Sequence, residues 1–117
     1  MTTGVIRTVA AIYDIHGNLL ALNAVIKEIE NVQADLILVG GDIVSGPMPR
    51  ETLDRFSSLN LPVRFIRGNG DREVVTAFDG KSLPETMSEE GCRVTEWVAE
   101  QLTRSQRDFL VQLPECI

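Results

Sequence analysis

The residues that could do chemistry lie in three short polar stretches at nearly even spacing. These are Asp14-Ile15-His16-Gly17-Asn18, Gly40-Gly41-Asp42 and Gly68-Asn69-Gly70-Asp71. Asp42 follows Asp14 by 28 positions, and Asn69 follows Asp42 by 27. Carboxylates, an imidazole and an amide oxygen form a mixed ligand set that suits manganese, iron or zinc better than calcium. Two such ions held close together could activate a hydroxide and clamp a phosphoryl group for in-line attack.

The elements that position these stretches can be predicted from apolar patterning. A strand–helix–strand unit takes about 30 residues, so the spacing predicts one polar stretch per unit. Apolar runs rich in β-branched residues predict strands at 5–13, 34–39 and 63–66, the first buried on both faces. Helices are predicted at 19–32, 49–59, 72–78, 92–102 and 103–113, with 68–71 and 79–88 as loops.

Local signals place the helix starts and the apolar helix faces. Asn18 is a suitable N-cap for the first helix, and Thr103 with Gln106 has capping-box spacing at the start of the last one. Apolar residues at helical spacing predict a buried face on each long helix. For the helix at 92–102 this face includes Trp97 and Val98, so we expect both in the core.

Strands that alternate with helices predict an α/β fold with a parallel sheet flanked by helices and right-handed crossovers. Because parallel strands share one carboxyl edge, all three polar stretches should gather there. The side chains expected at this edge are Asp14, His16, Asp42, Asn69 and Asp71. An extended backbone from Asp14 to His16 would let both side chains face one ion, and the two oxygens of Asp42 could bridge two.

Composition limits the other classes of function. The 117 residues fit a single domain, and the net charge of −6 with only two lysines argues against a nucleic-acid surface. Divalent ions could still attract a small phosphorylated substrate. The apolar run near the N-terminus is too short to cross a membrane. Cys92 and Cys116, without a signal segment, favour free thiols in a reducing, cytoplasmic compartment.

Each candidate residue also has a simpler interpretation. A single aspartate after a strand, such as Asp14 or Asp42, is often a helix cap or a turn residue. His16 could be an ordinary loop residue, and Asn69-Gly70 on its own indicates a turn. The functional interpretation therefore depends on three stretches that coincide at one edge.

Together, the motifs resemble the first three motifs of the calcineurin-like metallophosphoesterases. Those motifs are D-x-H, G-D and G-N-x-D/E, in this order and at about this spacing, and the resemblance covers residues 5–72. Gly46-Pro47, which follows Gly41-Asp42, is similar to the residues at this place in the bacterial small-phosphodiesterase branch of the family. The resemblance implies a sandwich of two sheets flanked by helices (α-β-β-α), of which residues 1–117 would form the first half, truncated before the second sheet. It also implies hydrolysis of phosphomonoesters or phosphodiesters by a metal-bound hydroxide.

Residue by residue, the resemblance assigns roles around two divalent ions, which can be manganese, iron, zinc or nickel. Asp14 and His16 would bind the first ion, and Asp42 would bridge both. Asn69 would bind the second ion and contact the substrate phosphate. Asn69 and Asp71 would be the catalytic residues, Asp71 as a carboxylate that lies behind the metal ligands.

Asn18 would order the loop near the substrate. The sequence also departs from the family pattern at several positions. Gly70 stands where many members have a histidine that protonates the leaving group, so activated diesters become more plausible substrates. No histidine follows His16, whereas the family's later motifs supply three. We therefore expect one metal ion or none, little turnover, and an exposed apolar sheet face that favours self-association.

Other classes of protein remain as alternatives. A non-catalytic domain that keeps the fold and binds a metal ion or a partner fits the missing histidines. A receiver-type signalling domain needs an acidic neighbour for Asp14 and a lysine after a late strand, and neither is present. A dinucleotide-binding domain needs G-x-G-x-x-G after the first strand, which is absent.

Overall fold

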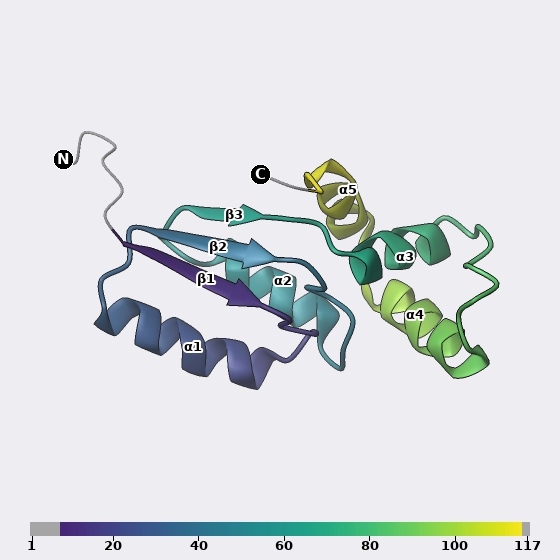
Figure 1. The fold of residues 1–117 in the computed structure, drawn as a ribbon, viewed down its shortest axis with the longest axis horizontal. Coiled ribbons are helices and arrows are strands. Elements are labelled where there is room, and N and C mark those ends of the chain that lie inside the picture. Colours follow the sequence, from purple (N-terminus) through teal and green to yellow (C-terminus); the bar gives the residue numbers. More distant parts are fainter. Residues whose placement is uncertain (1–7, 116–117) are drawn as a thin grey trace.

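The computed structural model describes residues 8–115, which form an α/β fold built on a three-stranded parallel sheet (Figure 1). Its strands β1 (Val9–Tyr13), β2 (Leu36–Gly40) and β3 (Val63–Phe65) lie in the order β1-β2-β3. The parallel sheet predicted from the sequence is therefore confirmed. The predicted strand residues 5–7, and Cys116, lie outside the described residues.

Helices α1 (Leu19–Asn31) and α2 (Pro49–Ser57) connect the strands and cover the same face of the sheet (Figure 1). The predicted apolar face of α1 is buried through Leu22, Ile26 and Ile29. The core beneath it includes Ile37 and Val39 of β2, which are fully buried. Each buried side chain of this size contributes about 1.5–3 kcal/mol, so this layer fixes the strand ends that carry the polar stretches.

The opposite face of the sheet is open, which corrects the prediction that β1 is buried on both faces. Val9 and Tyr13 are 50% and 65% exposed, and Ala11 between them is exposed as well. The register places these three on the same face as Leu36 and Leu38. Among the described residues helices cover only the other face of β1 and β2 (Figure 1). The expected exposed apolar surface is thus confirmed, and we call these five residues the open sheet face.

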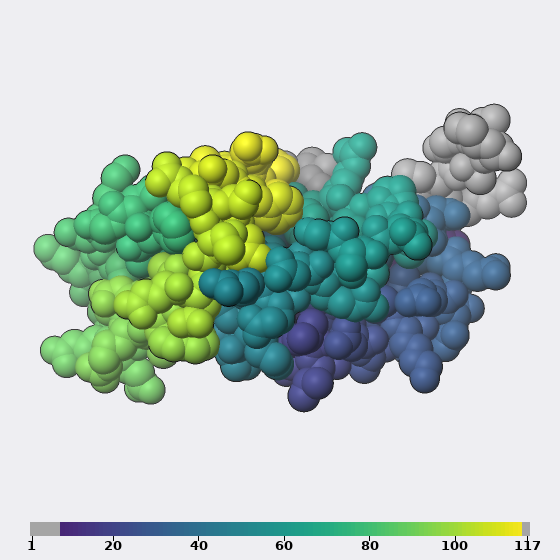
Figure 2. All heavy atoms as spheres, turned by 180° about the vertical axis from the view of Figure 1, so that it is seen from behind, coloured from purple at the N-terminus to yellow at the C-terminus, as the bar shows by residue number. Residues whose placement is uncertain are grey.

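Helices α3 (Asn69–Phe78), α4 (Glu89–Gln101) and α5 (Arg104–Gln112) form a helical lobe beyond the carboxyl ends of the strands. Figure 2 shows this green and yellow lobe beside the sheet and its two helices. Helix α3 packs against both α4 and α5. It begins at Asn69, so the stretch predicted as a loop at 68–71 is in fact the N-cap and first turn of α3.

The buried face of α4 differs from the predicted one. Trp97 is 44% exposed, so it does not lie in the core as expected, and Val94 one turn earlier is 49% exposed as well. Val98 and Ala99 are buried instead. The predicted face was too wide, because only Val98 and Ala99 are buried in α4, which packs against α3 and α2. None of the helices among residues 8–115 has the length and apolarity needed to cross a membrane.

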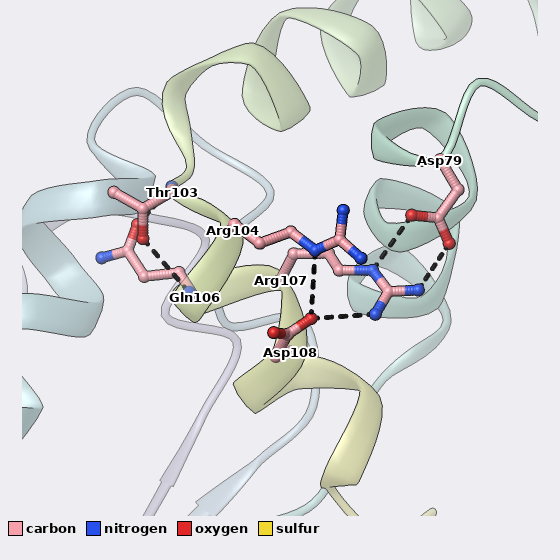
Figure 3. A network of polar contacts seen from close by, with 6 residues as sticks. All are labelled: Asp79, Thr103, Arg104, Gln106, Arg107 and Asp108. Atoms are coloured by element: carbon pink, nitrogen blue, oxygen red, sulfur yellow. Dashed lines mark hydrogen bonds and ion pairs between the residues drawn. The ribbon is translucent and has the colours of Figure 1, made fainter.

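Polar contacts fix the last helix to the lobe (Figure 3). Thr103 caps α5 in the predicted capping box: its Oγ1 accepts from the Gln106 N–H, and Gln106 Oε1 accepts from the Thr103 N–H. Arg107 donates to both carboxylate oxygens of Asp79, at 3.0 and 2.7 Å, and to Asp108 at 2.9 Å. These contacts join α5 to the end of α3.

Three phenylalanines connect the sheet to the helical lobe. Phe65 of β3 meets Phe56 of α2 and Phe109 of α5 edge to face, with ring centroids 5.2 and 5.1 Å apart. Such pairs add about 0.5–1.5 kcal/mol beyond the burial of their area. They hold α5 close to the carboxyl end of β3.

Candidate metal centre

Three of the predicted ligands come together at the carboxyl edge of the sheet. Asp14 and His16 follow β1, and Asp42 follows the neighbouring strand β2. One ligand atom from each lies within 4.8 Å of the others, and His16 Nε2 is 3.7 Å from Asp14 Oδ1. No other cluster of three or more His, Cys, Asp or Glu side chains with this spacing occurs among residues 8–115.

The backbone at these three residues is left-handed rather than extended. The φ angles are 55° at Asp14, 50° at His16 and 52° at Asp42. The expectation of an extended backbone from Asp14 to His16 is therefore wrong, although both side chains still reach one point. In the described chain only one other non-glycine residue, Gln33, has a positive φ. Left-handed residues cost about 1–2 kcal/mol each and concentrate at functional sites.

Backbone hydrogen bonds join the loops after β1 and β2, residues 14–18 and 41–48, which we call the loop pair. The His16 N–H donates to the Asp42 carbonyl at 3.1 Å, and the Gly17 N–H donates to the Ile43 carbonyl at 2.9 Å. Gly46 packs directly on this junction, since a Cβ there would lie 1.4 Å from the His16 carbonyl oxygen. The loop pair therefore holds the three ligand residues as one unit.

Asp71 lies buried beneath the loop pair and joins it to α3. Its Oδ1 accepts from the N–H groups of Ile43 and Val44 at 2.8 and 3.2 Å, and its Oδ2 accepts from Gly68 at 2.9 Å. Burial raises the pKa of the Asp71 carboxyl above its usual value, and the nearby charge of Asp42 acts in the same direction. The three N–H groups oppose this shift but do not cancel it.

The third polar stretch reaches the centre through the first turn of α3. The Gly70 N–H donates to Asp42 Oδ1 at 2.9 Å, so the start of the helix orients this carboxylate. Asn69 is exposed, and its Oδ1 accepts from Arg72 Nη2 at 2.8 Å. Arg72 was not singled out in the sequence, because an arginine inside a helix carries no distinctive spacing.

Gly70 has no room for a side chain in this arrangement. A Cβ there would lie 2.5 Å from Ser45 Oγ and 2.8 Å from Asp42 Oδ1. A histidine at position 70 would therefore require Ser45 to move. Ser45 was also missed in the sequence, since nothing in the loop's composition distinguishes it.

Asn18 sits at the entrance to this edge. It caps α1 as predicted, with Oδ1 accepting from the Ala21 N–H at 3.1 Å. Together with Asp14, His16 and Ser45 it lines a pocket of about 530 Å³. This volume lies within the range of small-molecule sites.

The residues present fit a divalent cation. The Asp14 and His16 side chains are 74% and 52% exposed, and within residues 8–115 no lysine or arginine pairs with Asp14 or Asp42. Two carboxylates and an imidazole suit manganese, iron or zinc. The cluster therefore offers negative charge and suitable donors without an internal counter-cation.

Comparisons with known proteins agree with this chemistry. The description "Calcineurin-like phosphoesterase" belongs to the family profile that matches residues 7–111. An uncharacterized protein of Methanocaldococcus jannaschii is 34% identical over 107 residues, which are 91% of this chain and 42% of that protein. The crystal structure of a metallophosphoesterase from Sphaerobacter thermophilus is 29% identical with a TM-score of 0.67, over 91% of this chain and 41% of that one. The chain spans less than half the length of both.

Proposed function

Because the chain belongs to the calcineurin-like phosphoesterase family, we propose that it takes part in metal-dependent hydrolysis of a phosphomonoester or phosphodiester. The observation that carries this proposal is the convergence of Asp14, His16 and Asp42 within 4.8 Å. All three residues have left-handed backbones, a strained conformation that is concentrated at functional sites. The small phosphorylated substrate would enter the adjoining pocket of about 530 Å³.

Each residue has a distinct part in this proposal. Asp14, His16 and Asp42 would hold the first divalent ion, for which manganese is our preferred candidate. When bound, such an ion lowers the pKa of a water molecule and polarises phosphoryl oxygens. Asp42 and Asn69 would also hold a second ion, and Asn69 would contact the substrate phosphate. The Gly70 N–H keeps Asp42 Oδ1 oriented for these roles.

Asp71 and Asn18 act on the site in different ways. The Asp71 carboxylate uses both of its oxygens on backbone N–H groups, so its proposed role is to position the loop pair rather than to contact substrate. Asn18 borders the pocket and contacts the bound ester. Since Gly70 offers no proton to a leaving group, diesters with good leaving groups are the proposed substrates. The proposed compartment is the cytoplasm.

A second candidate is a non-catalytic domain that retains the fold and binds a metal ion or a partner. His16 is the only histidine in the sequence, so these 117 residues do not supply the further histidine ligands that the family's later motifs provide. The open sheet face offers an apolar surface that could pair with a second copy of the chain. In this candidate the metal centre would bind an ion without turnover.

Metal loading followed by an activity assay separates the two candidates. The chain is loaded with Mn²⁺, desalted and analysed for metal content, and hydrolysis of bis(p-nitrophenyl) phosphate is then measured. We expect bound Mn²⁺, and a loss of affinity of about 100-fold in Asp42→Asn, which keeps the shape but removes the charge, because even residues behind the ligands typically contribute about 10–100-fold. Asp79→Asn, a carboxylate remote from the loop pair, is the matched control and should bind as the unchanged chain does.

The outcomes have separate meanings. Mn²⁺ binding with measurable hydrolysis supports the phosphoesterase, and Mn²⁺ binding without hydrolysis supports the non-catalytic domain. No binding, or equal binding in Asp42→Asn, contradicts a metal site at these residues. Elution volume on a sizing column over a range of concentrations tests self-association in the same preparation.

A further inference from the structure

Two arginines converge on one oxygen atom next to Asn69. Arg67 Nη2 is 3.1 Å from Glu115 Oε1, and Arg72 Nη1 is 3.7 Å from the same oxygen. Arg72 also donates through Nη2 to Asn69 Oδ1 at 2.8 Å. The two guanidinium groups therefore surround a point that already holds an anionic oxygen, beside the residue proposed to contact phosphate.

Arg67 uses only part of its binding capacity on Glu115. Its Nε is buried and has no hydrogen-bond partner within the described residues. In a guanidinium group Nε–H and Nη2–H point in the same direction, and an oxyanion can accept from both. Glu115 accepts from Nη2 alone. The unsatisfied Nε–H costs free energy that a bidentate phosphate could recover.

The contact with Glu115 can be exchanged for another anion. The Glu115 side chain is 57% exposed and that of Arg72 is 52% exposed, so solvent screens this pair, whereas the side chain of Arg67 is only 18% exposed and its contact is screened through Glu115 alone. Such surface ion pairs contribute about 0–1 kcal/mol. The segment that carries Glu115 is held separately, since the Arg67 N–H donates to the Pro114 carbonyl at 2.7 Å. Glu115 can thus swing away while the backbone stays in place.

A pocket of about 350 Å³ begins at the same arginine. Its lining includes the polar residues Asn69, Arg72 and Thr76 together with Leu83 and Pro84. An organic group attached to an anion could occupy this pocket while the anion meets the guanidinium groups. The pocket is lined differently from the one beside Asp14 and His16.

We propose that Arg67 and Arg72 form an anion subsite that binds a phosphate or carboxylate group of the substrate, in competition with Glu115. The inference rests on the proposed phosphoesterase function and narrows its substrate to an ester with a second anionic group. Glu115 occupies the subsite when substrate is absent. Arg72 also stays in contact with Asn69, so the subsite lies beside the reacting phosphate.

The test measures binding of inorganic phosphate by ³¹P NMR to the full chain, from which metal ions have first been removed with EDTA and the EDTA then removed by desalting. Glu115→Gln should bind phosphate about fivefold more tightly than the unchanged chain, because the competing charge is gone. Arg72→Gln should bind about tenfold more weakly, as expected for the loss of one charge-assisted contact of about 1.4 kcal/mol. Glu28→Gln in α1 and Arg93→Gln in α4 change exposed residues that line neither pocket and should leave the affinity unchanged.

Other outcomes overturn the subsite. Equal phosphate affinity in Glu115→Gln and the unchanged chain would exclude competition, and retained affinity in Arg72→Gln would exclude the arginine pair. If Glu115→Gln lowers the urea midpoint without tighter phosphate binding, Glu115 is only a structural contact. Mn²⁺ binding is measured on the same variants. Failure of Mn²⁺ to bind would reject the proposed function but not the subsite, and normal Mn²⁺ binding without phosphate binding would do the reverse.

Discussion

The acidic side chains of the loop pair and those of the helical lobe differ in whether an arginine or lysine pairs with them. In the loop pair, Asp14 and Asp42 have left-handed backbones and no arginine or lysine partner among residues 8–115. In the helical lobe, Asp79 and Asp108 are both held by Arg107 (Figure 3). Acidic residues that are paired with arginine stabilise packing. The unpaired acidic residues on a strained backbone are instead positioned to bind a cation that the chain itself does not supply.

The largest expected difference between these regions comes from one added methyl group. In Gly46→Ala the new Cβ would lie 1.4 Å from the His16 carbonyl oxygen, so backbone in both loops must move. We expect a loss of at least about 3 kcal/mol in the free energy of unfolding, measured in urea, because backbone cannot yield as a side chain does. Mn²⁺ affinity should fall as well.

Gly80→Ala in the helical lobe is the matched control. No atom lies within 4 Å of a Cβ at this position, and only its φ of +72° opposes the substitution. Its cost should be about 1 kcal/mol, with no change in Mn²⁺ affinity. Equal losses in the two variants would show that the loop pair is no more tightly constrained than the lobe.

A smaller effect is expected from removing the carboxylate beneath the loop pair. Asp71→Ala leaves the N–H groups of Ile43, Val44 and Gly68 without their acceptor. We expect a loss of about 2 kcal/mol in the free energy of unfolding, since relief of a buried charge offsets part of the cost. Asp108→Ala in the lobe should cost less than about 1 kcal/mol. A loss no larger in Asp71→Ala than in Asp108→Ala would contradict the positioning role.

The smallest effect concerns acid stability and belongs to the helical lobe. Hydrogen bonds from Arg107 hold the pKa of Asp79 below its ordinary value of 3.8. A carboxyl whose pKa is lowered on folding adds stability above its unfolded pKa and loses it as the pH falls through the folded pKa. Urea unfolding at pH 6 and pH 3 should therefore show a steeper acid loss in the unchanged chain than in Asp79→Asn. Parallel pH profiles would mean that the contact contributes nothing in solution.

The features that could be predicted from the sequence depend on local patterns. The βα period placed Asp14, His16 and Asp42 at one edge, because parallel strands have their carboxyl ends together. Asn18 and Thr103 were predicted as caps because capping depends on a few adjacent residues. Whether Asn69 and Asp71 act in catalysis stays a prediction.

The features that could not be predicted depend on distant parts of the chain. The open sheet face follows from both crossover helices lying on the same side, while the apolar run of β1 matches a strand buried on two sides. Trp97 is half exposed because α4 packs against its neighbouring helices through Val98 and Ala99 instead. The left-handed backbones at the ligands and the burial of Asp71 arise from hydrogen bonds between loops that are far apart in sequence.

The junction between the two loops also limits how the chain can change in length. An inserted residue in either loop would shift the donors of His16 and Gly17 against the acceptors of Asp42 and Ile43. The connection between α3 and α4 has no such partner loop and includes the open position Gly80. Insertions that diversify binding, whether natural or engineered, are therefore best tolerated there. The lengths of the two loops in the loop pair are therefore fixed, whereas the connection between α3 and α4 can change in length and sequence.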